Sequence, residues 1–396
     1  MSNQLRIGLV FTYSLSYCRE ILRGVKDFAS TRQQWIFTPV APEDDGLRVL
    51  KALKPQGIIA HIYSRELARS LVAMRKPLVN VSGVMPKLSV PRVGLDDVGI
   101  GRLAARHLLD RGLRNFAFVG HSDQPYSQRR EHGFRDELRS VGGEVACYHE
   151  TQTRFDPRGR LWALDPGLLR WVASLPKPVG AFACNDIWGF QISEACRQVL
   201  RRIPEDLALL GVDDDDLLCD LARPSLSSVS VPAREVGRKA AALLEHLLDG
   251  GRPPAEDLEL PPTGVVTRQS SNLLAIHDAE VSAAIRFIWE NAHRPLAIDD
   301  VLESVAVCRR TLERRFRDAL NRGIWDEIRR VHMERAKNLL TSTDWPMSTV
   351  ATAAGFSDGK HLSIVFRQET GLTPTAYRRQ LNAHPRHSSQ MAIAKT

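Results

Sequence analysis

The residues whose types and spacing most clearly suggest chemistry lie between positions 309 and 317. Five charged side chains share one side of a predicted helix there: Arg309, Arg310, Glu313, Arg314 and Arg317. Leu312 and Phe316, four residues apart, form the opposite apolar side. Arginine is the commonest bidentate donor to guanine, and glutamate accepts a hydrogen bond from cytosine. The pattern therefore predicts a helix that reads base edges in the major groove of DNA.

A second helix of the same design is predicted further along the chain. Its outward positions are Gly359, Lys360, His361 and Ile364, and its inward positions are Leu362 and Phe366. Each of the two helices follows a shorter helix and a tight turn, over 298–316 and 347–366, as in a helix-turn-helix. Two such units in tandem can enter successive major-groove faces of one duplex. Since Gly359 and Ile364 offer no polar atom to a base, we expect the first unit to carry more of the specificity.

One long amphipathic helix is expected to join the two units. Its predicted buried residues, which recur at helical spacing, are Trp325, Ile328, Val331, Leu339 and Leu340. Asp278 is expected to cap the first helix of this end of the chain. From 309 to 337 there are ten Lys/Arg against five Asp/Glu, in a chain whose net charge is +8. This concentration of positive charge beside the first unit favours nucleic acid as the partner.

With 396 residues the chain is too long for one core, so two or three domains are expected. Its six cysteines are scattered, with no C-x-x-C and no histidine at metal-ligand spacing, so we expect reduced thiols, no metal site and no cofactor. The apolar run 7–11 soon turns polar, which indicates a buried strand and not a signal peptide. No stretch has the length of a membrane span. These features predict a cytoplasmic protein without a membrane partner.

Before residue 262, short apolar runs alternate with longer amphipathic stretches. The predicted strands are 7–11, 57–61, 78–82, 116–120, 179–184 and 207–212, and the predicted helices are 17–29, 98–110, 128–140, 187–200 and 233–248. Such alternation is typical of α/β folds with parallel sheets and helices on both faces, whose ligands bind beyond the carboxyl ends of the strands. Glycine and proline clusters end this part, and the polar stretch 267–277 is expected to be a hinge.

The stretch Gly99-Ile-Gly-Arg-Leu-Ala104 matches the dinucleotide fingerprint G-x-G-x-x-A, so an NAD-dependent oxidoreductase is the alternative function. The context disfavours it, because Asp96 or Asp97 is expected to cap the helix and to place both glycines in its first turn. The acidic run 213–216 lacks the alternate spacing and the glycine of a calcium loop. No catalytic set has a recognisable local signature. We therefore assign no catalytic residue and do not expect an enzyme.

Several motifs near the C-terminus resemble, in their order, the AraC-type DNA-binding domain. They are Leu312-Glu-Arg-Arg-Phe316, Arg335-Ala-Lys-Asn-Leu-Leu340, Ala354-Gly-Phe-Ser357 and Gly371-Leu-Thr-Pro-Thr-Ala-Tyr-Arg378. The resemblance implies that Arg310, Glu313 and Arg314 contact bases in the first unit. In the second unit it assigns the base-contacting positions to Gly359, Lys360, His361 and Ile364. Cys308 departs from the serine that is usual at the start of the first recognition helix, which should weaken the helix cap.

Residues 1–272 resemble the sugar-sensing domain of LacI-type repressors, which has the two-lobed fold of periplasmic binding proteins. The segments that carry the resemblance are 7–10 with 21–24, 93–99 with 104–109, 130–134, 185–186 with 203–213, and 223–229 with 235–241. The resemblance implies that Arg130, Asn185 and Asp213 contact a monosaccharide, and that Tyr17 and Arg19, in the loop after the first strand, line the same site. No helix-turn-helix motif precedes the first predicted strand, so DNA binding is expected at the other end of the chain.

A LacI-type sensor followed by an AraC-type reader is the order found in regulators of xylose operons, a family that the chain resembles end to end. The resemblance implies a homodimeric activator of a sugar catabolic operon. Its partners would be an operator in double-stranded DNA, xylose or a related monosaccharide, and RNA polymerase. The expected domains are a sensor over 1–272, a DNA-binding domain over 273–383 and a disordered tail over 384–396. Sugar bound between the two lobes is expected to close them and to favour the DNA-competent form.

Overall fold

The computed structural model describes residues 4–30, 35–85, 88–150, 164–272, 278–320, 322–343 and 345–382. The chain divides into two compact units, Met1–Leu273 and Leu274–Thr396, which we call the N-terminal unit and the C-terminal unit. The tail predicted over 384–396 lies outside the described residues. Every described helix is too short or too polar to cross a lipid bilayer.

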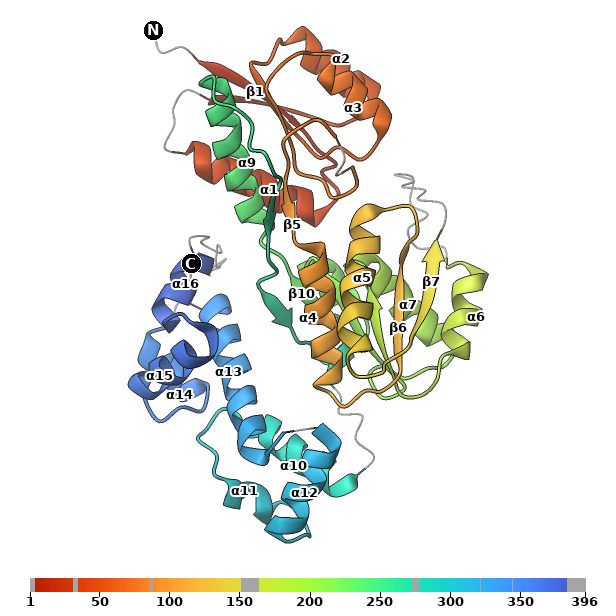
Figure 1. Ribbon diagram of the computed structural model, residues 1–396, viewed down its shortest axis with the longest axis vertical. Coiled ribbons are helices and arrows are strands. Elements are labelled where there is room, and N and C mark those ends of the chain that lie inside the picture. The colour runs from red at the N-terminus through yellow and green to blue at the C-terminus, as the bar shows by residue number, and fades with distance from the viewer. Residues whose placement is uncertain are drawn as a thin grey trace, which may run out of the picture. The chain divides into compact units, whose positions relative to one another are not determined.

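The first lobe of the N-terminal unit is a parallel four-stranded sheet with helices on both faces (Figure 1). In the order β2-β1-β3-β4 across the sheet, its strands are β2 (Trp35–Val40), β1 (Leu5–Val10), β3 (Gly57–Ala60) and β4 (Leu78–Asn80). Its helices are α1 (Ser16–Ala29), α2 (Asp44–Ala52), α3 (Arg65–Val72) and α9 (Ala233–Leu248). Gly8 of β1 faces Leu50 of α2, whereas Gly57 of β3 faces Leu244 of α9. Because these neighbouring strands are paired in the register Ile7↔Gly57, the two helices cover opposite faces.

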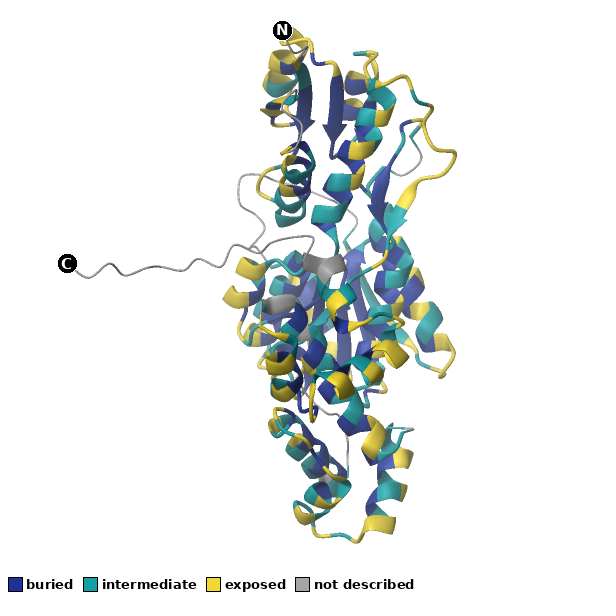
Figure 2. Cartoon of the chain, turned by 90° about the vertical axis from the view of Figure 1, so that its left-hand side faces the viewer, coloured by how far each residue is buried: buried dark blue, intermediate teal, exposed yellow. Residues whose placement is uncertain are grey.

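The second lobe has a six-stranded sheet in the order β12-β10-β9-β8-β6-β7, parallel except for β12. Its strands are β6 (Phe116–His121), β7 (Val145–Glu150), β8 (Val179–Ala183), β9 (Leu207–Val212), β10 (Ser227–Ser230) and β12 (Gly264–Val266). Its helices are α4 (Asp97–Leu109), α5 (Pro125–Arg139), α6 (Pro166–Ser174), α7 (Asp186–Gln198) and α8 (Asp216–Leu221). The central strands β8 and β9 are buried at every residue. Dark blue in Figure 2 marks the buried residues, which include much of the sheets. The predicted α/β class with parallel sheets is therefore confirmed.

The chain passes between the two lobes three times. It leaves β4 through β5 (Val93–Leu95) for α4, leaves β10 for α9, and returns from α9 through β11 (Leu258–Leu260) to β12. The strands β5 and β11 pair with each other in parallel and belong to neither larger sheet. Arg92 beside β5 is almost fully buried, and its guanidinium donates to Asp257 at 2.8 Å and to Glu259 at 2.5 Å. Arg129 of α5 donates to the same Glu259, so ion pairs tie β11 to the second lobe.

The glycines of the candidate dinucleotide motif serve helix capping and helix packing. The side chain of Asp96 caps α4 by accepting a hydrogen bond from the Gly99 amide at 2.9 Å. A Cβ atom added at Gly101 would lie 2.0 Å from the Arg130 carbonyl oxygen, because α4 and α5 cross with their backbones in contact. Both glycines thus lie in the first turns of a capped helix, which is the arrangement that disfavours the oxidoreductase alternative.

The polar stretch expected to be a hinge over 267–277 is partly anchored in the N-terminal unit, which corrects that prediction. Ser270 and Ser271, in the 3-10 turn Gln269–Ser271, are buried. The Ser270 hydroxyl donates to the Leu209 carbonyl at 2.7 Å, and the Arg111 guanidinium donates to the Ser271 carbonyl. The polar composition of this stretch suggested a solvent-exposed segment. In the structure, the polar atoms of both serines form hydrogen bonds with other residues of the N-terminal unit. Residues 273–277 lie outside the described ranges.

The C-terminal unit is all-helical. Its helices are α10 (Ala279–Glu290), α11 (Ile298–Glu303), α12 (Arg309–Leu320), α13 (Ile324–Ser342), α14 (Met347–Ala353), α15 (Gly359–Thr370) and α16 (Pro374–Asn382). The Asp278 carboxylate caps α10 as predicted, accepting from the amides of Glu280 and Val281. The helix pairs α11–α12 and α14–α15 form the two predicted helix-turn-helix units, and Gly355 takes a positive φ of 81° in the second turn.

Two separate cores support the two units, and α13 contributes to both. Ile328 of α13 packs with Leu312 and Phe316 in the first core. Leu340, three turns further along α13, packs in the second core, with Leu362 and Phe366. Val331 and Leu339 are partly buried against these cores. The prediction that Trp325 is buried was wrong: it is 51% exposed, because Ile324 and Ile328 occupy the inward positions of this helical turn and Trp325 is rotated away from them.

Candidate functional site

A buried arginine organises the polar side chains at one end of the second lobe. Arg130 lies on α5 with only 5% of its side chain exposed. Its Nε donates to Asp97 at 3.0 Å, and its Nη1 donates to the Cys184 carbonyl at 2.5 Å. Its Nη2 lies 3.9 Å from a carboxylate oxygen of Asp213. The salt bridge that Arg130 makes is therefore internal and not on an exposed helix surface.

Parallel strands bring these residues together because their carboxyl ends meet at one edge of the sheet. Cys184 directly follows β8, and Asp213 directly follows β9, the neighbouring strand. Asp97 opens α4, and Arg130 faces it from α5. We use the name Arg130 cluster for six residues: Tyr17, Asp97, Tyr126, Arg130, Asn185 and Asp213.

Aromatic groups lie beside the charges. The guanidinium carbon of Arg130 is 5.1 Å from the centre of the Tyr126 ring. The Asn185 amide donates to the Tyr126 hydroxyl at 3.4 Å, while the Asn185 carbonyl oxygen caps α7 by accepting from the Trp188 amide at 2.9 Å. The indole of Trp188 donates to His121 at 3.0 Å. Charged acceptors, an arginine donor and aromatic faces are the groups from which a site for a polyhydroxyl ligand is built.

Tyr17 approaches this cluster from the first lobe. It lies in the first turn of α1, and its hydroxyl donates to the Val81 carbonyl at 3.2 Å. Burial raises the pKa of the Tyr17 hydroxyl, and the negative charges of Asp97 and Asp213 raise it further. Tyr17 was expected in the loop after β1 and instead lies on α1.

Asp213 has a raised side-chain pKa and an unusual backbone conformation. Burial is the main cause that raises its pKa to about 6, and the positive charge of Arg130 opposes that shift. Its backbone has a positive φ of 107°, a conformation that L-residues rarely adopt, and its amide donates to the Val229 carbonyl at 3.1 Å. A strained backbone and a destabilised charge at one residue are more typical of binding sites than of structural positions.

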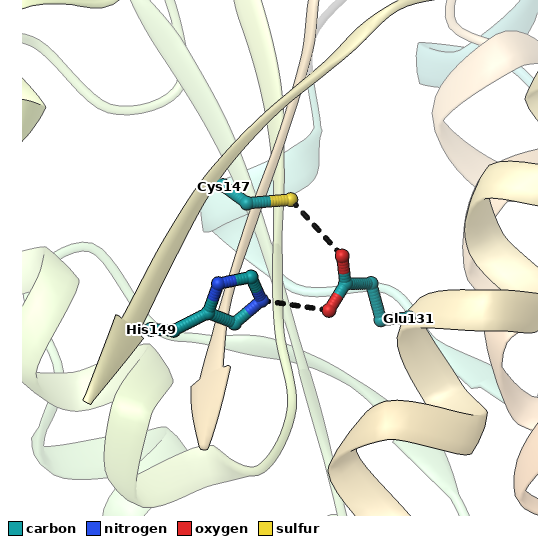
Figure 3. Close-up of side chains that lie close together, drawn as sticks. All are labelled: Glu131, Cys147 and His149. Atoms are coloured by element: carbon teal, nitrogen blue, oxygen red, sulfur yellow. Dashed lines mark hydrogen bonds and ion pairs between the residues drawn. The ribbon is translucent and has the colours of Figure 1, made fainter. Parts of the chain in front are cut away.

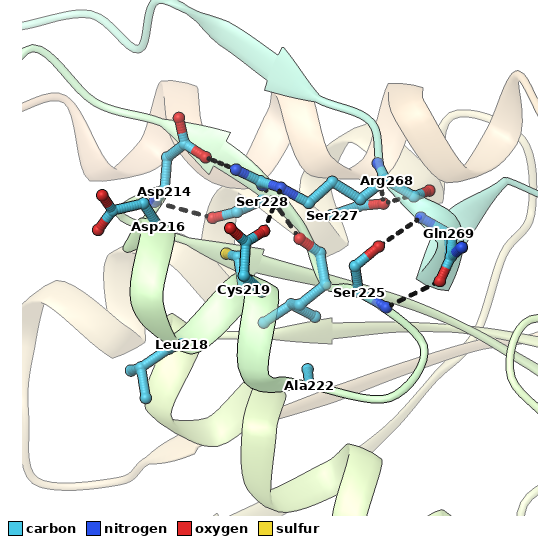
Figure 4. A network of polar contacts seen from close by, with 12 residues as sticks. Asp214, Asp216, Leu218, Cys219, Ala222, Ser225, Ser227, Ser228, Arg268 and Gln269 are labelled. Atoms are coloured by element: carbon cyan, nitrogen blue, oxygen red, sulfur yellow. Dashed lines mark hydrogen bonds and ion pairs between the residues drawn. The ribbon is translucent and has the colours of Figure 1, made fainter. Parts of the chain in front are cut away.

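The carboxylates of the acidic run 213–216 have different partners and do not converge on one point. The run is therefore neither a fully solvated loop nor a cation site. Asp214 pairs with Arg268 at 2.8 Å, and its backbone amide donates to the Ser228 hydroxyl oxygen at 3.0 Å (Figure 4). The Asp215 carboxylate caps α8 by accepting from the Leu218 amide at 3.2 Å. Asp216 is exposed in the first turn of α8, so Asp213 is the one acid of the run that lies beside Arg130.

The structure brings together four of the five residues predicted to contact a sugar: Tyr17, Arg130, Asn185 and Asp213. Arg19 is the exception, since its guanidinium donates to the carbonyls of Tyr13 and Ser14 and braces the loop before α1. Sequence reasoning missed Asp97 and Tyr126. The available signal was the pair Asp96-Asp97, of which only Asp96 is needed as the helix cap.

In the C-terminal unit, α12 exposes the side chains predicted to read DNA. Arg309, Arg310 and Arg314 are exposed. Glu313 is held by Arg309 at 2.9 Å, so a base contact through Glu313 requires exchange of this partner. On the second recognition helix α15, the Asp358 carboxylate caps the helix by accepting from the His361 amide at 2.8 Å.

The other outward residues of α15 are accessible too. Lys360 and His361 are exposed, Ile364 is 50% exposed, and a Cβ at Gly359 would meet nothing closer than 3.9 Å. At the start of α12, the Cys308 thiol lies 3.3 Å from the Thr311 hydroxyl, and hydrogen bonds from Thr311 lower the pKa of the thiol. Cys308 thus occupies the position of the serine cap that it was expected to replace.

Two family models match the chain: a periplasmic binding protein-like domain over residues 105–271 and a helix-turn-helix domain over residues 302–380. The xylose operon regulatory protein of Escherichia coli (strain K12) is 28% identical over 384 residues, covering 94% of this chain and 96% of that protein. The xylose operon regulatory protein of Haemophilus influenzae is 27% identical and covers 94% of this chain and 98% of its own length. The solved structure of a xylose-binding transcription activator matches with a TM-score of 0.60 at 26% identity, over 96% of this chain and 99% of that one.

The chain therefore belongs to the transcription regulators in which a periplasmic binding protein-like domain precedes a C-terminal helix-turn-helix domain. Over nearly its whole length it is similar to the xylose operon regulatory proteins. These relatives are regulators and not enzymes, and they give no support to the oxidoreductase alternative.

Proposed function

We propose that this regulator binds a monosaccharide, xylose or a closely related sugar, at the Arg130 cluster. The observation that carries the proposal is the buried Arg130 held between Asp97 and Asp213, with Tyr126 beneath it. Adjacent sugar hydroxyls pair well with carboxylate acceptors and an arginine donor, and a sugar ring packs on an aromatic face. The relatives described as xylose operon regulators support a pentose as the ligand.

Both lobes contribute to the proposed site, which gives a sugar the means to change the balance between open and closed forms. Tyr17 comes from the first lobe, and Arg130 comes from the second. A ligand that contacts both lobes only in the closed form binds that form more tightly and shifts the equilibrium by that difference alone. The three connections around β5 and β11 are where the chain would bend.

We further propose that the regulator works in the cytoplasm as a homodimer, binds an operator through α12 and α15 of each protomer, and activates transcription by contact with RNA polymerase. The direct outcome of sugar binding would be a change in how the dimer presents its recognition helices to two half-sites. Support comes from the exposed arginines of α12 and from the similarity to a described transcription activator.

A thermal-shift screen of the full chain against aldopentoses, hexoses and nicotinamide cofactors tests the ligand. A sugar present at a hundredfold excess over its Kd should stabilise the N-terminal unit by about 2.7 kcal/mol. Asp213→Ala should abolish the shift, and Arg19→Ala, which alters only the loop brace, should retain it. A full shift in Asp213→Ala, or a shift with nicotinamide cofactors alone, would overturn the assignment.

An operator-binding titration tests the response. The full chain should bind its operator with an affinity that changes on addition of the sugar, whereas Asp213→Ala should keep the basal affinity and lose the change. A mutant that loses basal DNA binding as well would show that Asp213 supports the fold and not only the sugar response.

A further inference from the structure

Three side chains with metal-ligand chemistry converge on the second lobe, away from the Arg130 cluster. Glu131 extends from α5, and Cys147 and His149 extend from the same side of the edge strand β7 (Figure 3). Their potential ligand atoms all lie within 4.8 Å of one another. The Cys147 thiol donates to one Glu131 oxygen at 3.3 Å, and His149 Nε2 lies 2.7 Å from the other.

We propose that Glu131, Cys147 and His149 form a binding site for zinc(II), against the expectation from the sequence that the chain has no metal site. Thiolate, imidazole and carboxylate are the three ligand types that zinc prefers in proteins, and three protein ligands leave one tetrahedral position for water. A thiolate together with an imidazole excludes magnesium and calcium, which take oxygen ligands. Alternation along β7 explains the convergence, because residues two apart project from the same face of a strand.

The protein already neutralises this cluster with a cation of its own. The Arg135 guanidinium donates to Glu131 at 2.8 Å and contacts the Cys147 sulfur at 2.9 Å. Zinc must displace it. Arg135 has room to leave, because it also lines an open hollow of about 350 Å³ with Arg139, Gly143, Glu144 and Val145.

Binding involves one proton exchange and no redox step. The S–H bond of Cys147 breaks, its proton goes to solvent, and the sulfur forms a bond to the metal. His149 binds as the neutral imidazole through Nε2, and Glu131 binds through the oxygen that now contacts His149. Zinc bound between these atoms would lie about 2.0–2.1 Å from the nitrogen and the oxygen and about 2.3 Å from the sulfur, so the three side chains need only small shifts to surround it.

Cobalt(II), added to the full reduced chain as a spectroscopic substitute for zinc, tests the site. A thiolate-to-cobalt charge-transfer band and intense tetrahedral visible bands are expected, and zinc should remove both by competition. Cys147→Ser should abolish the charge-transfer band, and His149→Gln should weaken cobalt binding by about tenfold or more. Circular dichroism of both variants shows that the fold is intact.

Cys308→Ser is the matched control, because Cys308 is the other exposed or half-exposed thiol among the described residues. It should leave the cobalt spectrum unchanged. Arg135→Gln should tighten zinc binding by removing the competing cation. A wild-type chain without a charge-transfer band, or a band that persists in Cys147→Ser and disappears in Cys308→Ser, would overturn the proposal.

Discussion

Arg130 brings a positive charge into the interior of the N-terminal unit, and the carboxylates around it offset the cost of removing that charge from water. Burial alone lowers the pKa of such a group, but Asp97 and Asp213 raise it, so the guanidinium stays charged. Under the proposed function, the same carboxylate oxygens would be the acceptors offered to a sugar. Ligand binding would then be an exchange of partners around a fixed cation.

The acidity of Asp213 predicts how sugar binding depends on pH. Its pKa is raised to about 6, so the carboxylate becomes protonated as the pH falls through 6 and then ceases to be a charged acceptor. If only the ionised form binds, affinity should be constant above pH 7 and about tenfold lower at pH 5. Calorimetric titrations at pH 5 to 8 measure this. In Asp213→Asn the residual affinity should not vary with pH over the same range, and a variant that keeps the wild-type profile would assign the titration to another group.

The recognition helices predict two different kinds of DNA mutant. Arg314→Ala should cost about 1–3 kcal/mol and relax the preference at one base pair, because a bidentate contact to a base edge is lost. Lys360→Ala, at the start of α15, should weaken binding to all sequences and reduce its salt dependence. Competition binding with operators altered at single positions distinguishes them. Unchanged base preference in Arg314→Ala would remove this residue from the reading face.

Single residues also show why the site could be predicted only in part. Arg130 and Asp213 could be found because a family resemblance marks their positions. Asp97 resembled a second helix cap in the sequence, and only the crossing of α4 and α5 shows that its carboxylate faces Arg130. Arg19 has the right type and lies beside Tyr17, but its rotamer turns it toward the loop. Side-chain direction of this kind depends on tertiary contacts.

At the scale of elements, close helix crossings hold the Arg130 cluster in place. Gly101 of α4 lies against the backbone of α5, and Gly133 of α5 lies against the backbone of α4, where an added Cβ would be 2.1 Å from the Val98 carbonyl oxygen. We therefore expect the two helices to move as one body, so that Arg130 and Asp97, one on each helix, would keep their separation when the lobes move.

Gly101→Ala should destabilise the N-terminal unit by about 1–3 kcal/mol, because the methyl group must push the two helices apart. Gly359→Ala is the matched control: it is also a helical glycine, but a Cβ there meets nothing closer than 3.9 Å. That variant should be neutral or stabilising by about 0.5–1 kcal/mol. Urea denaturation of both variants tests the contrast, and equal effects would contradict the packing role of Gly101.

A buried carboxylate supports the first core of the C-terminal unit. Glu327 on α13 is fully buried and paired with Arg322 at 2.7 Å and Arg330 at 2.7 Å. Glu327→Ala should destabilise this unit by about 3–5 kcal/mol, since two guanidinium groups lose their common partner. Burial raises the pKa of Glu327, but the hydrogen bonds and charges of Arg330 and Arg322 outweigh it and lower the pKa below 4.5.

Stability from this triad should accordingly be complete above pH 4.5 and decline as the pH falls through the lowered folded-state pKa. Thermal melts of the C-terminal unit within the full chain, followed at pH 3 to 7, measure the decline. Glu327→Gln should remove most of this pH dependence. A wild-type slope in that variant would mean that other carboxylates dominate acid unfolding.

Strands that are buried on both faces were predictable from their apolar runs in the sequence, whereas the partly exposed strands β7 and β11 were not. β8 and β9 are uninterrupted apolar runs, as their central positions require. β7 at the sheet edge has no fully buried residue, and β11 has only three residues, so neither gave a clear apolar signal. Both helix-turn-helix units were predictable because short-range spacing and turn chemistry define them.

At the scale of the whole molecule, a salt bridge connects the proposed sugar site with the end of the N-terminal unit. Asp214, the residue after Asp213, pairs with Arg268 at 2.8 Å (Figure 4). Arg268 directly precedes the anchored turn Gln269–Ser271, beyond which the chain continues to the C-terminal unit. A shift of the 213–214 loop on sugar binding would act on this segment.

Arg268→Gln should therefore leave the sugar Kd within about twofold and reduce the sugar-induced change in operator affinity by about tenfold, a coupling loss of roughly 1.4 kcal/mol. Parallel sugar and operator titrations on the full chain measure both quantities. Arg268→Lys, which keeps the charge, should retain part of the coupling. Loss of sugar affinity together with coupling would instead mean that Arg268 shapes the pocket.

The three crossings between the lobes also set the order in which the protein can be completed during synthesis. Strands β1 to β4 leave the ribosome first, but α9, whose backbone meets α1 at Gly24 and Gly237, is made only after most of the second lobe. The second lobe is continuous from α4 to β10 and lacks its edge strand β12 and the buried turn Gln269–Ser271. A fragment that ends near residue 230 and has left the ribosome should therefore contain a nearly complete second lobe beside an unfinished first one. The part of the regulator that is translated first would be the last to close its core.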